Sequence, residues 1–417
     1  MKNRIYDFVI IGSGPSSIGA ILASKSNNFA VISGETQNKV ECKDLNIHKK
    51  ILYEVNEKKN NFISNIFKYK KQSIFSINKI GGFANYWGQG CEFVPYNKLK
   101  KNYFKNEKEY KKIINSIYDF FKVEKSKKSF TQKKIKFYPS PILENSPLKK
   151  KTGLDSFRYA FKHLRKKKKF EVINSEVLKV KNFGNKIFIE TRKKKIICKK
   201  IFLAANTVGN TKIIFNSDKY VEQASFWDDC PYLVYAIINN SSLNKFLSNS
   251  YSVICPKLNN FFISLYNTNK INMSFFFFYF TGHKLNFLKR FNCKFLPFLK
   301  FIQIWSHQTK VQGFLNTDMS FEIKNNKLIK NNFSSILNLF KIHPIKFAQT
   351  KFGEGFHYHN LKIKKDKKWY FFDEYIKIFF NKKIICIDSS VEKDINPGPF
   401  TITQMAIAYK KLKKNTF

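Results

Sequence analysis

A glycine-rich turn directly after a short apolar run is the feature that most limits how this chain can fold. The apolar run covers residues 5–11, and the turn reads Gly12-Ser13-Gly14-Pro15-Ser16-Ser17. A helical pattern then extends to about Ser24, and a second apolar run covers Phe29–Ile32. Strand, glycine turn, helix and strand in this order are typical of a Rossmann-type α/β fold with a parallel sheet. The turn therefore predicts a dinucleotide-binding site.

Each position of the turn has an expected role. Gly12 permits the tight turn, and Gly14 lets the backbone approach a pyrophosphate at the helix N-terminus. Ser17 stands at the third position, where a small residue allows close packing of the helix. Further along, Glu35 is the candidate acid for the adenosine ribose hydroxyls. Because the motif stands at the beginning of the sequence, we expect FAD rather than NAD.

The later patterns divide the chain into two kinds of sheet. A helical stripe over residues 104–121 predicts core packing, and short β-type runs follow between Phe170 and Leu203. Aromatic-rich runs with Asn and Ser turns over residues 230–345 predict an antiparallel sheet. A strand at Ile384–Ile387 and an amphipathic helix from about Thr401 complete the pattern.

From these patterns we predict a discontinuous FAD-binding domain, a β-sheet substrate domain and a helical excursion over the cleft between them. The FAD-binding domain is expected at residues 1–100, 150–220 and 350–417. The substrate domain is expected at residues 221–349 and the excursion at residues 101–149. The predicted fold class is α/β, with a parallel Rossmann-type sheet and an antiparallel substrate sheet.

The formal charge of +47 raises the question of a nucleic-acid or membrane surface. Nearly all cations are lysines, spread along a chain that is also rich in Asn, Ile and Phe; arginine occurs only at Arg4, Arg158, Arg165, Arg192 and Arg290. A dedicated nucleic-acid surface uses Arg forks for phosphate and base contacts. We therefore interpret the charge as compositional and expect no specific nucleic-acid partner.

The seven cysteines form no CxxC pair and no metal-ligand spacing. Reduced thiols and a cytoplasmic location are the expectation, with no metal site. No run reaches the ~18 apolar residues of a membrane-spanning helix, so no transmembrane segment is expected. The opening apolar stretch runs into the glycine turn instead of a small-residue cleavage site, which argues against a signal peptide.

A second glycine-rich segment carries a family resemblance. Gly81-Gly82-Phe83-Ala84-Asn85-Tyr86-Trp87-Gly88 resembles the loop that lies along the flavin in the glucose–methanol–choline (GMC) oxidoreductases. The resemblance implies that Gly81 and Gly82 bring backbone amides to the cofactor, and that Asn85 or Trp87 addresses the isoalloxazine or closes the pocket. Tyr86 stands where some relatives carry a flavin-linked His, so covalent attachment there is not expected.

Four more segments resemble the same family. The resemblance implies that the backbone of Val177 contacts the adenine and that the region of Asp388, in Ile387-Asp388-Ser389-Ser390-Val391, meets the ribityl chain. A helix beginning near Thr401 would direct its positive end at flavin N1 and O2. Asn206 stands where the family has Gly in a strand–turn–helix segment, and Asn tolerates the left-handed backbone that such a turn needs.

The loop Gly355-Phe356-His357-Tyr358 is similar to the one that carries the family's active-site His. His357 is thus the candidate base, and His359 is a second candidate in the same loop. The family's second active-site residue falls here on Gly398 or Pro399, whose side chains cannot exchange protons. This incomplete dyad resembles GMC-like members associated with surface-polysaccharide pathways.

The predicted function is FAD-dependent oxidation of a CH–OH group of a small alcohol, sugar or polyol, by hydride transfer to flavin N5 with an electron acceptor that the sequence does not reveal. One alternative is a flavin-fold protein that has lost alcohol oxidation and serves as a binding or assembly component. A second alternative is a charge-driven binder of polyanions or membrane surfaces. The missing dyad partner favours the first alternative, and the presence of His357 favours the enzyme.

Overall fold

The computed structural model describes the greater part of the chain, in segments. These are residues 4–34, 63–69, 72–77, 80–82, 84, 91–99, 103–124, 129–132, 135–139, 141–143, 156–248, 252–258, 261–266, 299–306, 310–317, 321–324, 337–338, 341–349, 358–380, 382–393 and 400–416. Among the predicted site residues, Glu35, Asn85 and His357 lie outside these segments. Gly398, Pro399 and the flavin-loop residues Tyr86 and Trp87 do so as well.

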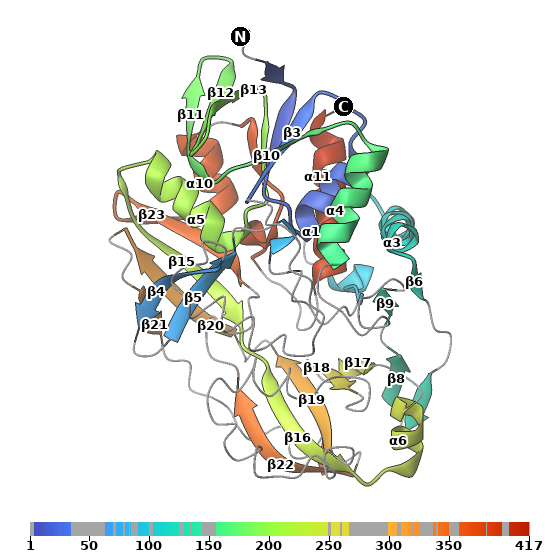
Figure 1. Ribbon diagram of the computed structural model, residues 1–417. Helices are drawn as coiled ribbons and strands as arrows, with labels where there is room; N and C mark the ends of the chain where they lie inside the picture. The colour runs from blue at the N-terminus through green and yellow to red at the C-terminus, as the bar shows by residue number, and fades with distance from the viewer. Residues whose placement is uncertain are drawn as a thin grey trace.

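A five-stranded parallel sheet lies in the part of the molecule that contains both chain termini (Figure 1). Its strands, in spatial order, are β10 (Glu171–Asn174), β3 (Phe29–Ser33), β2 (Phe8–Ile11), β14 (Ile201–Leu203) and β25 (Ile384–Cys386). All neighbouring pairs are parallel. Counted along the chain within this sheet, the order is 3-2-1-4-5, which is the Rossmann order. It reverses between β2 and β14.

The residues of β2 explain why both faces of this sheet are covered. All four are buried, and successive side chains of a strand point to opposite faces. Phe8 and Ile10 enter one apolar cluster, whereas Val9 and Ile11 enter another. A continuous apolar run is what a parallel strand with helices on both sides requires.

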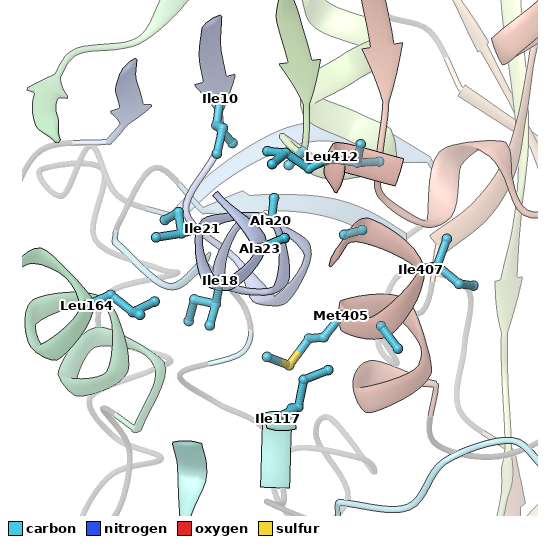
Figure 2. Close-up of a cluster of buried hydrophobic side chains, with 14 of the residues drawn as sticks. Ile10, Ile18, Ala20, Ile21, Ala23, Ile117, Leu164, Met405, Ile407 and Leu412 are labelled. Atoms are coloured by element: carbon cyan, nitrogen blue, oxygen red, sulfur yellow. The ribbon is translucent and has the colours of Figure 1, made fainter. Parts of the chain in front are cut away.

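Four helices share the first of these clusters. They are α1 (Pro15–Ala23), α3 (Glu107–Phe121), α4 (Ser156–Lys167) and α11 (Thr401–Thr416). Figure 2 shows side chains of all four helices meeting around α1. The opposite cluster includes residues of α5 (Asn206–Ser217) and α10 (Phe372–Phe379). The predicted helical stripe at residues 104–121 is confirmed, because its apolar positions are the buried side of α3.

Helices α1 and α11 approach so closely that one position must be glycine. A Cβ built on Gly19 would lie 2.2 Å from the backbone oxygen of Met405. The C-terminal helix is thereby fixed against the helix that starts at the glycine turn. Two segments almost four hundred residues apart in the sequence are in direct contact.

Three further sheets complete the architecture. A mixed sheet contains β1 (Ile5–Tyr6), β13 (Lys195–Cys198), β12 (Lys186–Thr191) and β11 (Val177–Phe183). A five-stranded antiparallel sheet contains β21 (Phe321–Lys324), β20 (Lys310–Asn316), β15 (Val221–Asp229), β23 (Tyr358–Lys365) and β24 (Lys368–Phe371). A seven-stranded antiparallel sheet contains β22 (Ile342–Gln349), β16 (Tyr232–Ile238), β19 (Leu299–Ser306), β18 (Phe261–Tyr266), β17 (Ser252–Leu258), β8 (Ile135–Pro139) and β7 (Phe130–Gln132).

The remaining elements are small. The strand pairs are β4 (Ile63–Tyr69) with β5 (Gln72–Ile77), and β6 (Val123–Glu124) with β9 (Ile142–Leu143). Helix α6 (Ser241–Ser248) packs on the seven-stranded sheet, and two short 3-10 helices are η2 (Tyr96–Lys98) and η5 (Ser389–Val391). None of the helices in the described segments has the length and apolarity needed to cross a membrane. The division into domains at the predicted limits stays a prediction.

Candidate functional site at the carboxyl edge of the parallel sheet

The glycine turn begins where β2 ends, next to the point at which the strand order reverses. Gly12 has a φ of +112°, and a Cβ on it would lie 2.1 Å from the backbone oxygen of Ala204. Ala204 follows β14, the strand on the other side of the reversal. In open α/β sheets, ligands bind outside the carboxyl ends of the strands at this point. Only glycine satisfies both the conformation and the close approach here.

The N-terminus of α1 has the properties of an anion site. No side chain of the described residues caps it at Gly14, and its first turn carries no acidic residue. A Cβ added to Gly14 would meet no described atom within 4 Å. At the third motif position, the Ser17 hydroxyl donates to the Gly12 carbonyl at 2.9 Å and is fully buried. The turn thus leaves uncapped amides beside open space, which suits a pyrophosphate.

A buried serine pair joins three segments at this turn. The hydroxyl oxygens of Ser13 and Ser33 are 2.6 Å apart, and Ser33 is the last residue of β3. The backbone N–H of Gly81 donates to the Ser13 hydroxyl at 3.0 Å. Gly81 and Gly82 both have positive φ, +89° and +55°. The second glycine segment of the sequence therefore lies directly against the first.

The hydroxyl of Ser175, just after β10, is buried and has no hydrogen-bond partner among the described residues. The Ser175 N–H donates to the Ser33 carbonyl at 2.9 Å. Ser175 is only 3% exposed. Val177, two residues later, is half-buried at the start of β11. In a nucleotide-binding fold this edge faces the adenosine, so the hydroxyl of Ser175 is available to it.

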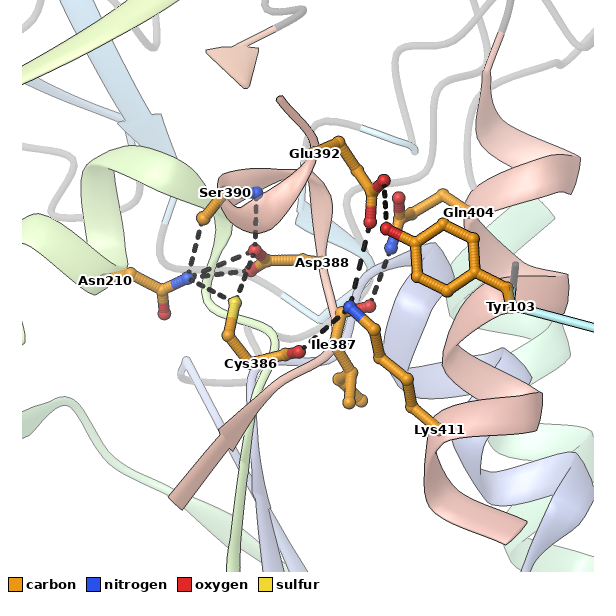
Figure 3. Close-up of polar contacts among 9 residues, drawn as sticks. All are labelled: Tyr103, Asn210, Cys386, Ile387, Asp388, Ser390, Glu392, Gln404 and Lys411. Carbon is orange, nitrogen blue, oxygen red and sulfur yellow. Dashed lines mark hydrogen bonds and ion pairs between the residues drawn. The ribbon is translucent and has the colours of Figure 1, made fainter. Parts of the chain in front are cut away.

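Asp388 lies at the end of β25, with its carboxylate turned to α5 (Figure 3). It accepts hydrogen bonds from the Asn206 N–H at 2.9 Å, from the Ser390 N–H at 3.0 Å and from the Asn210 side-chain amide at 2.9 Å. Cys386 donates its thiol at 3.2 Å. Burial, and next the Asp388 carboxylate, raise the pKa of the Cys386 thiol well above its ordinary value. The carboxylate acts as the cap of α5, and the backbone around it is held in place.

Asn206 has a φ of +67°, so the predicted left-handed turn is confirmed. The residue before it, Ala205, is the N-cap of α5 and has no capping side chain. The distant Asp388 supplies the missing acceptor. The sequence motif showed the turn, but the partner 182 residues away is visible only in the fold.

The C-terminal helix begins at Thr401, as predicted. In its first turn, the Gln404 side-chain amide donates to the Ile387 carbonyl at 2.7 Å, and its Oε1 has no hydrogen-bond partner among the described residues (Figure 3). The Thr403 hydroxyl accepts from the Val94 N–H at 2.8 Å. These bonds fix the N-terminal end of α11 beside β25. Its helix dipole and the Gln404 oxygen are then available to a ligand at the carboxyl edge.

A buried ionic group that the sequence did not reveal supports this helix. The Tyr103 hydroxyl donates to Glu392 at 2.6 Å, and the Lys411 ammonium lies 3.7 Å from the same carboxylate (Figure 3). Glu392 is 5% exposed. Burial, followed by the Glu392 carboxylate, raises the pKa of Tyr103. The group joins the loop before α3 to the turn after β25 and to α11.

Another buried pair lies where the five-stranded antiparallel sheet ends. His359 Nε2 is 3.2 Å from Asp229 Oδ1, and the two side chains are 1% and 5% exposed. His359 Nδ1 has no hydrogen-bond partner among the described residues. His359 was the second histidine candidate from the sequence. No sequence pattern marked Asp229 as its partner. The first candidate, His357, lies outside the described residues.

In sequence, the chain matches no protein family and no curated protein. In structure, it is similar to the pyridoxine 4-oxidase from Mesorbium loti, with a TM-score of 0.52 and 9% sequence identity. The similarity covers 98% of this chain and 99% of the oxidase, which is a GMC oxidoreductase. The chain therefore shares its fold with this oxidase. The predicted α/β class, with a parallel sheet beside antiparallel sheets, is confirmed.

Three observations show that the carboxyl edge of the parallel sheet fits a dinucleotide. The α1 N-terminus is uncapped beside open space, the Ser175 hydroxyl is buried without a partner, and so is the Gln404 Oε1. The α1 N-terminus follows β2 and Ser175 follows β10, while Gln404 is bonded to the segment after β25. All three groups therefore lie at the carboxyl ends of strands in the parallel sheet. Within the described segments, no group of three or more His, Cys, Asp or Glu side chains could hold a metal ion.

Proposed function

We propose that this protein binds FAD along the carboxyl edge of the parallel sheet and oxidises a CH–OH group of a small molecule, a sugar or polyol. The observation that supports this most strongly is the Gly12–Ser17 turn at the reversal of the strand order, with uncapped amides beside open space. The polysaccharide-related resemblance favours a carbohydrate. The name of the structural neighbour adds pyridoxine, an aromatic primary alcohol, to the compounds worth testing.

The proposed contacts follow the edge from strand to strand. Gly12, Gly14 and Ser17 hold the turn that receives the pyrophosphate. Ser175, Val177 and Glu35 serve the adenosine, and Gly81, Gly82, Asn85 and Thr401 serve the flavin. Asp388 contributes by fixing the turn at Asn206 and the backbone of Ser390. A flavin held by these residues would supply the acceptor for the hydride of the alcohol carbon.

The proton acceptor in this proposal is a histidine of the segment 357–359. The family resemblance favours His357, and the buried pair with Asp229 favours His359. Imidazole suits the task because its ordinary pKa lies close to neutrality. The N-terminal end of α11 would favour negative charge on a flavin bound beside it.

The visible spectrum of the purified protein tests cofactor binding. We expect a yellow protein that releases free FAD when it is denatured. A colourless protein that also takes up no added FAD would refute the flavoprotein proposal. If the protein is yellow but no alcohol reduces its flavin, the binding or assembly role becomes the better reading, as the residues at Gly398 and Pro399 suggest.

Anaerobic mixing with a panel of sugars, polyols and pyridoxine tests the chemistry. Bleaching of the flavin absorbance identifies a substrate. His357→Ala and His359→Ala are then compared, because neither residue lies in the proposed pyrophosphate site. The variant that lacks the proton acceptor should reduce its flavin about 10²–10⁴-fold more slowly, while reoxidation by an artificial acceptor changes much less. Unchanged reduction in both variants would exclude a histidine base in this segment.

A further inference from the structure

The buried pair of His359 and Asp229 lies at a joint between two sheets. Asp229 ends β15, and only two residues separate it from Tyr232, where β16 begins in the seven-stranded sheet. His359 is the second residue of β23, and it is paired with Trp227 in the register of the five-stranded sheet. Binding sites occur preferentially at such joints.

The same strand end is tied to the carboxyl edge of the parallel sheet. The Tyr358 carbonyl accepts hydrogen bonds from the Ser389 hydroxyl at 2.7 Å and from the Thr207 hydroxyl at 3.2 Å. Thr207 is in the first turn of α5, and Ser389 follows Asp388. Tyr358, which precedes His359 in the sequence, is therefore bonded to both turns that frame the proposed flavin site.

Hydrogen-bond chemistry assigns the two ring nitrogens. An ionised carboxylate only accepts, so the nitrogen that faces Asp229, Nε2, must donate. In a neutral imidazole the other nitrogen then carries a lone pair and no hydrogen. A hydrogen on Nδ1 as well would be a buried donor without an acceptor among the described residues, which is unfavourable. The arrangement leaves Nδ1 as a buried, bare acceptor.

We propose that Asp229 is a positioning residue that holds His359 in the Nε2–H tautomer, and that His359 Nδ1 accepts the hydroxyl proton of the alcohol. This inference rests on the proposed oxidation. The O–H proton goes to Nδ1, the C–H hydride goes to the bound flavin, and the alcohol becomes a carbonyl. The alcohol loses two electrons and the flavin gains them. His359, and not His357, is then the catalytic histidine.

The tautomer can be observed without substrate. The full-length protein, labelled with ¹⁵N in its histidine rings, gives ring-nitrogen NMR signals that distinguish a bare nitrogen from a protonated one; His359→Gln identifies the signals of His359 by their loss. In the wild type we expect Nε2 protonated and Nδ1 bare. In Asp229→Asn, whose amide N–H can donate to a bare Nε2, we expect the tautomer with its hydrogen on Nδ1 to predominate. A protonated Nδ1 in the wild type would overturn the proposal.

Flavin reduction by a substrate found in the panel supplies the second measurement. Asp229→Asn should slow it by about 10²–10⁴-fold, because a wrongly placed hydrogen removes the acceptor. The loss should fall on kcat rather than on KM, with FAD content unchanged. The matched control is Asp218→Asn in the turn between α5 and β15, where the carboxylate accepts from Lys365 and Tyr375, both at 2.6 Å. This control should keep the His359 tautomer and the wild-type reduction rate.

The two measurements separate the possible failures. A changed tautomer with an unchanged reduction rate in Asp229→Asn would overturn the role of His359 as proton acceptor. An unchanged tautomer in that variant would overturn the positioning role of Asp229. If the wild-type tautomer is as expected but no compound reduces the flavin, the proposed oxidation fails while the positioning by Asp229 stands.

Discussion

The carboxyl edge of the parallel sheet and the end of the five-stranded antiparallel sheet differ in the chemical groups that form each site. At the first, the backbone makes the site: the turn at Gly12, the uncapped amides of α1 and the start of α11. At the second, two side chains from separate strands, His359 and Asp229, make the pair. One region depends on conformation and the other on the identity of two residues.

This difference predicts how each region responds to mutation. Backbone amides and helix dipoles are present whatever the side chains are, so the first region tolerates substitution wherever space permits. Ser17 in place of the third motif glycine is an example, because its hydroxyl bonds the Gly12 carbonyl within the turn. The second region offers no such tolerance, because a carboxylate that only accepts fixes the hydrogen on the ring.

The largest effect expected in the first region comes from Gly12→Ala. The new methyl group would meet the Ala204 oxygen at 2.1 Å, and the backbone has a φ of +112°. Strain and overpacking together should lower the free energy of unfolding by about 2–6 kcal/mol and abolish FAD binding. Urea denaturation and flavin content measure the two losses.

Gly14→Ala is the matched control for the fold. Its methyl group meets no described atom within 4 Å, so the free energy of unfolding should stay close to that of the wild type. The methyl group would nevertheless occupy the space that we assign to the pyrophosphate, and FAD affinity should fall. A Gly14→Ala variant that binds FAD as the wild type does would break the assignment of this space.

A smaller effect is expected from Asp388→Asn, which tests whether the stability of the first region also depends on the negative charge of the Asp388 carboxylate. The amide would place donors against the donors of Asn206, Asn210 and Ser390. Loss of charge-assisted hydrogen bonds should lower the free energy of unfolding by about 2–4 kcal/mol, measured by urea denaturation. The control is Asp7→Asn, whose carboxylate is 41% exposed and pairs with Lys199 at 2.9 Å. This exposed pair should contribute no more than about 1 kcal/mol.

The two regions also differ in how far the sequence predicted them. The turn at Gly12, the helix start at Thr401 and the left-handed Asn206 follow from local patterns, and each is confirmed. A turn or helix start is encoded within a few residues, so one sequence reveals it. The roles of the predicted site residues stay predictions.

Contacts between distant segments could not be predicted in this way. The partners Asp388 and Asn206 are 182 residues apart, and His359 and Asp229 are 130 residues apart. No local pattern of hydrophobicity or turn residues distinguishes Asp229 from other acids of the chain. Its meaning depends on strand register, which brings the end of β15 beside the start of β23. The same holds for Gly19, whose contact with Met405 depends on how α11 packs.

The smallest expected effect concerns Asn206 and separates conformation from side-chain identity within the first region. Its φ of +67° costs a residue with a Cβ about 1–2 kcal/mol, less for Asn, whose side chain bonds locally. The Asn206 side chain accepts a hydrogen bond from the Thr207 N–H. Asn206→Ala loses this bond and keeps the strain, so the free energy of unfolding should fall by about 1–2 kcal/mol. Asn206→Gly loses the bond but relieves the strain, and its stability should stay within about 0.5 kcal/mol of the wild type. Equal destabilisation by Ala and Gly in urea denaturation would show that the side-chain bond, and not the backbone conformation, decides at this position. The first region would then depend on side-chain identity in the way that the second does.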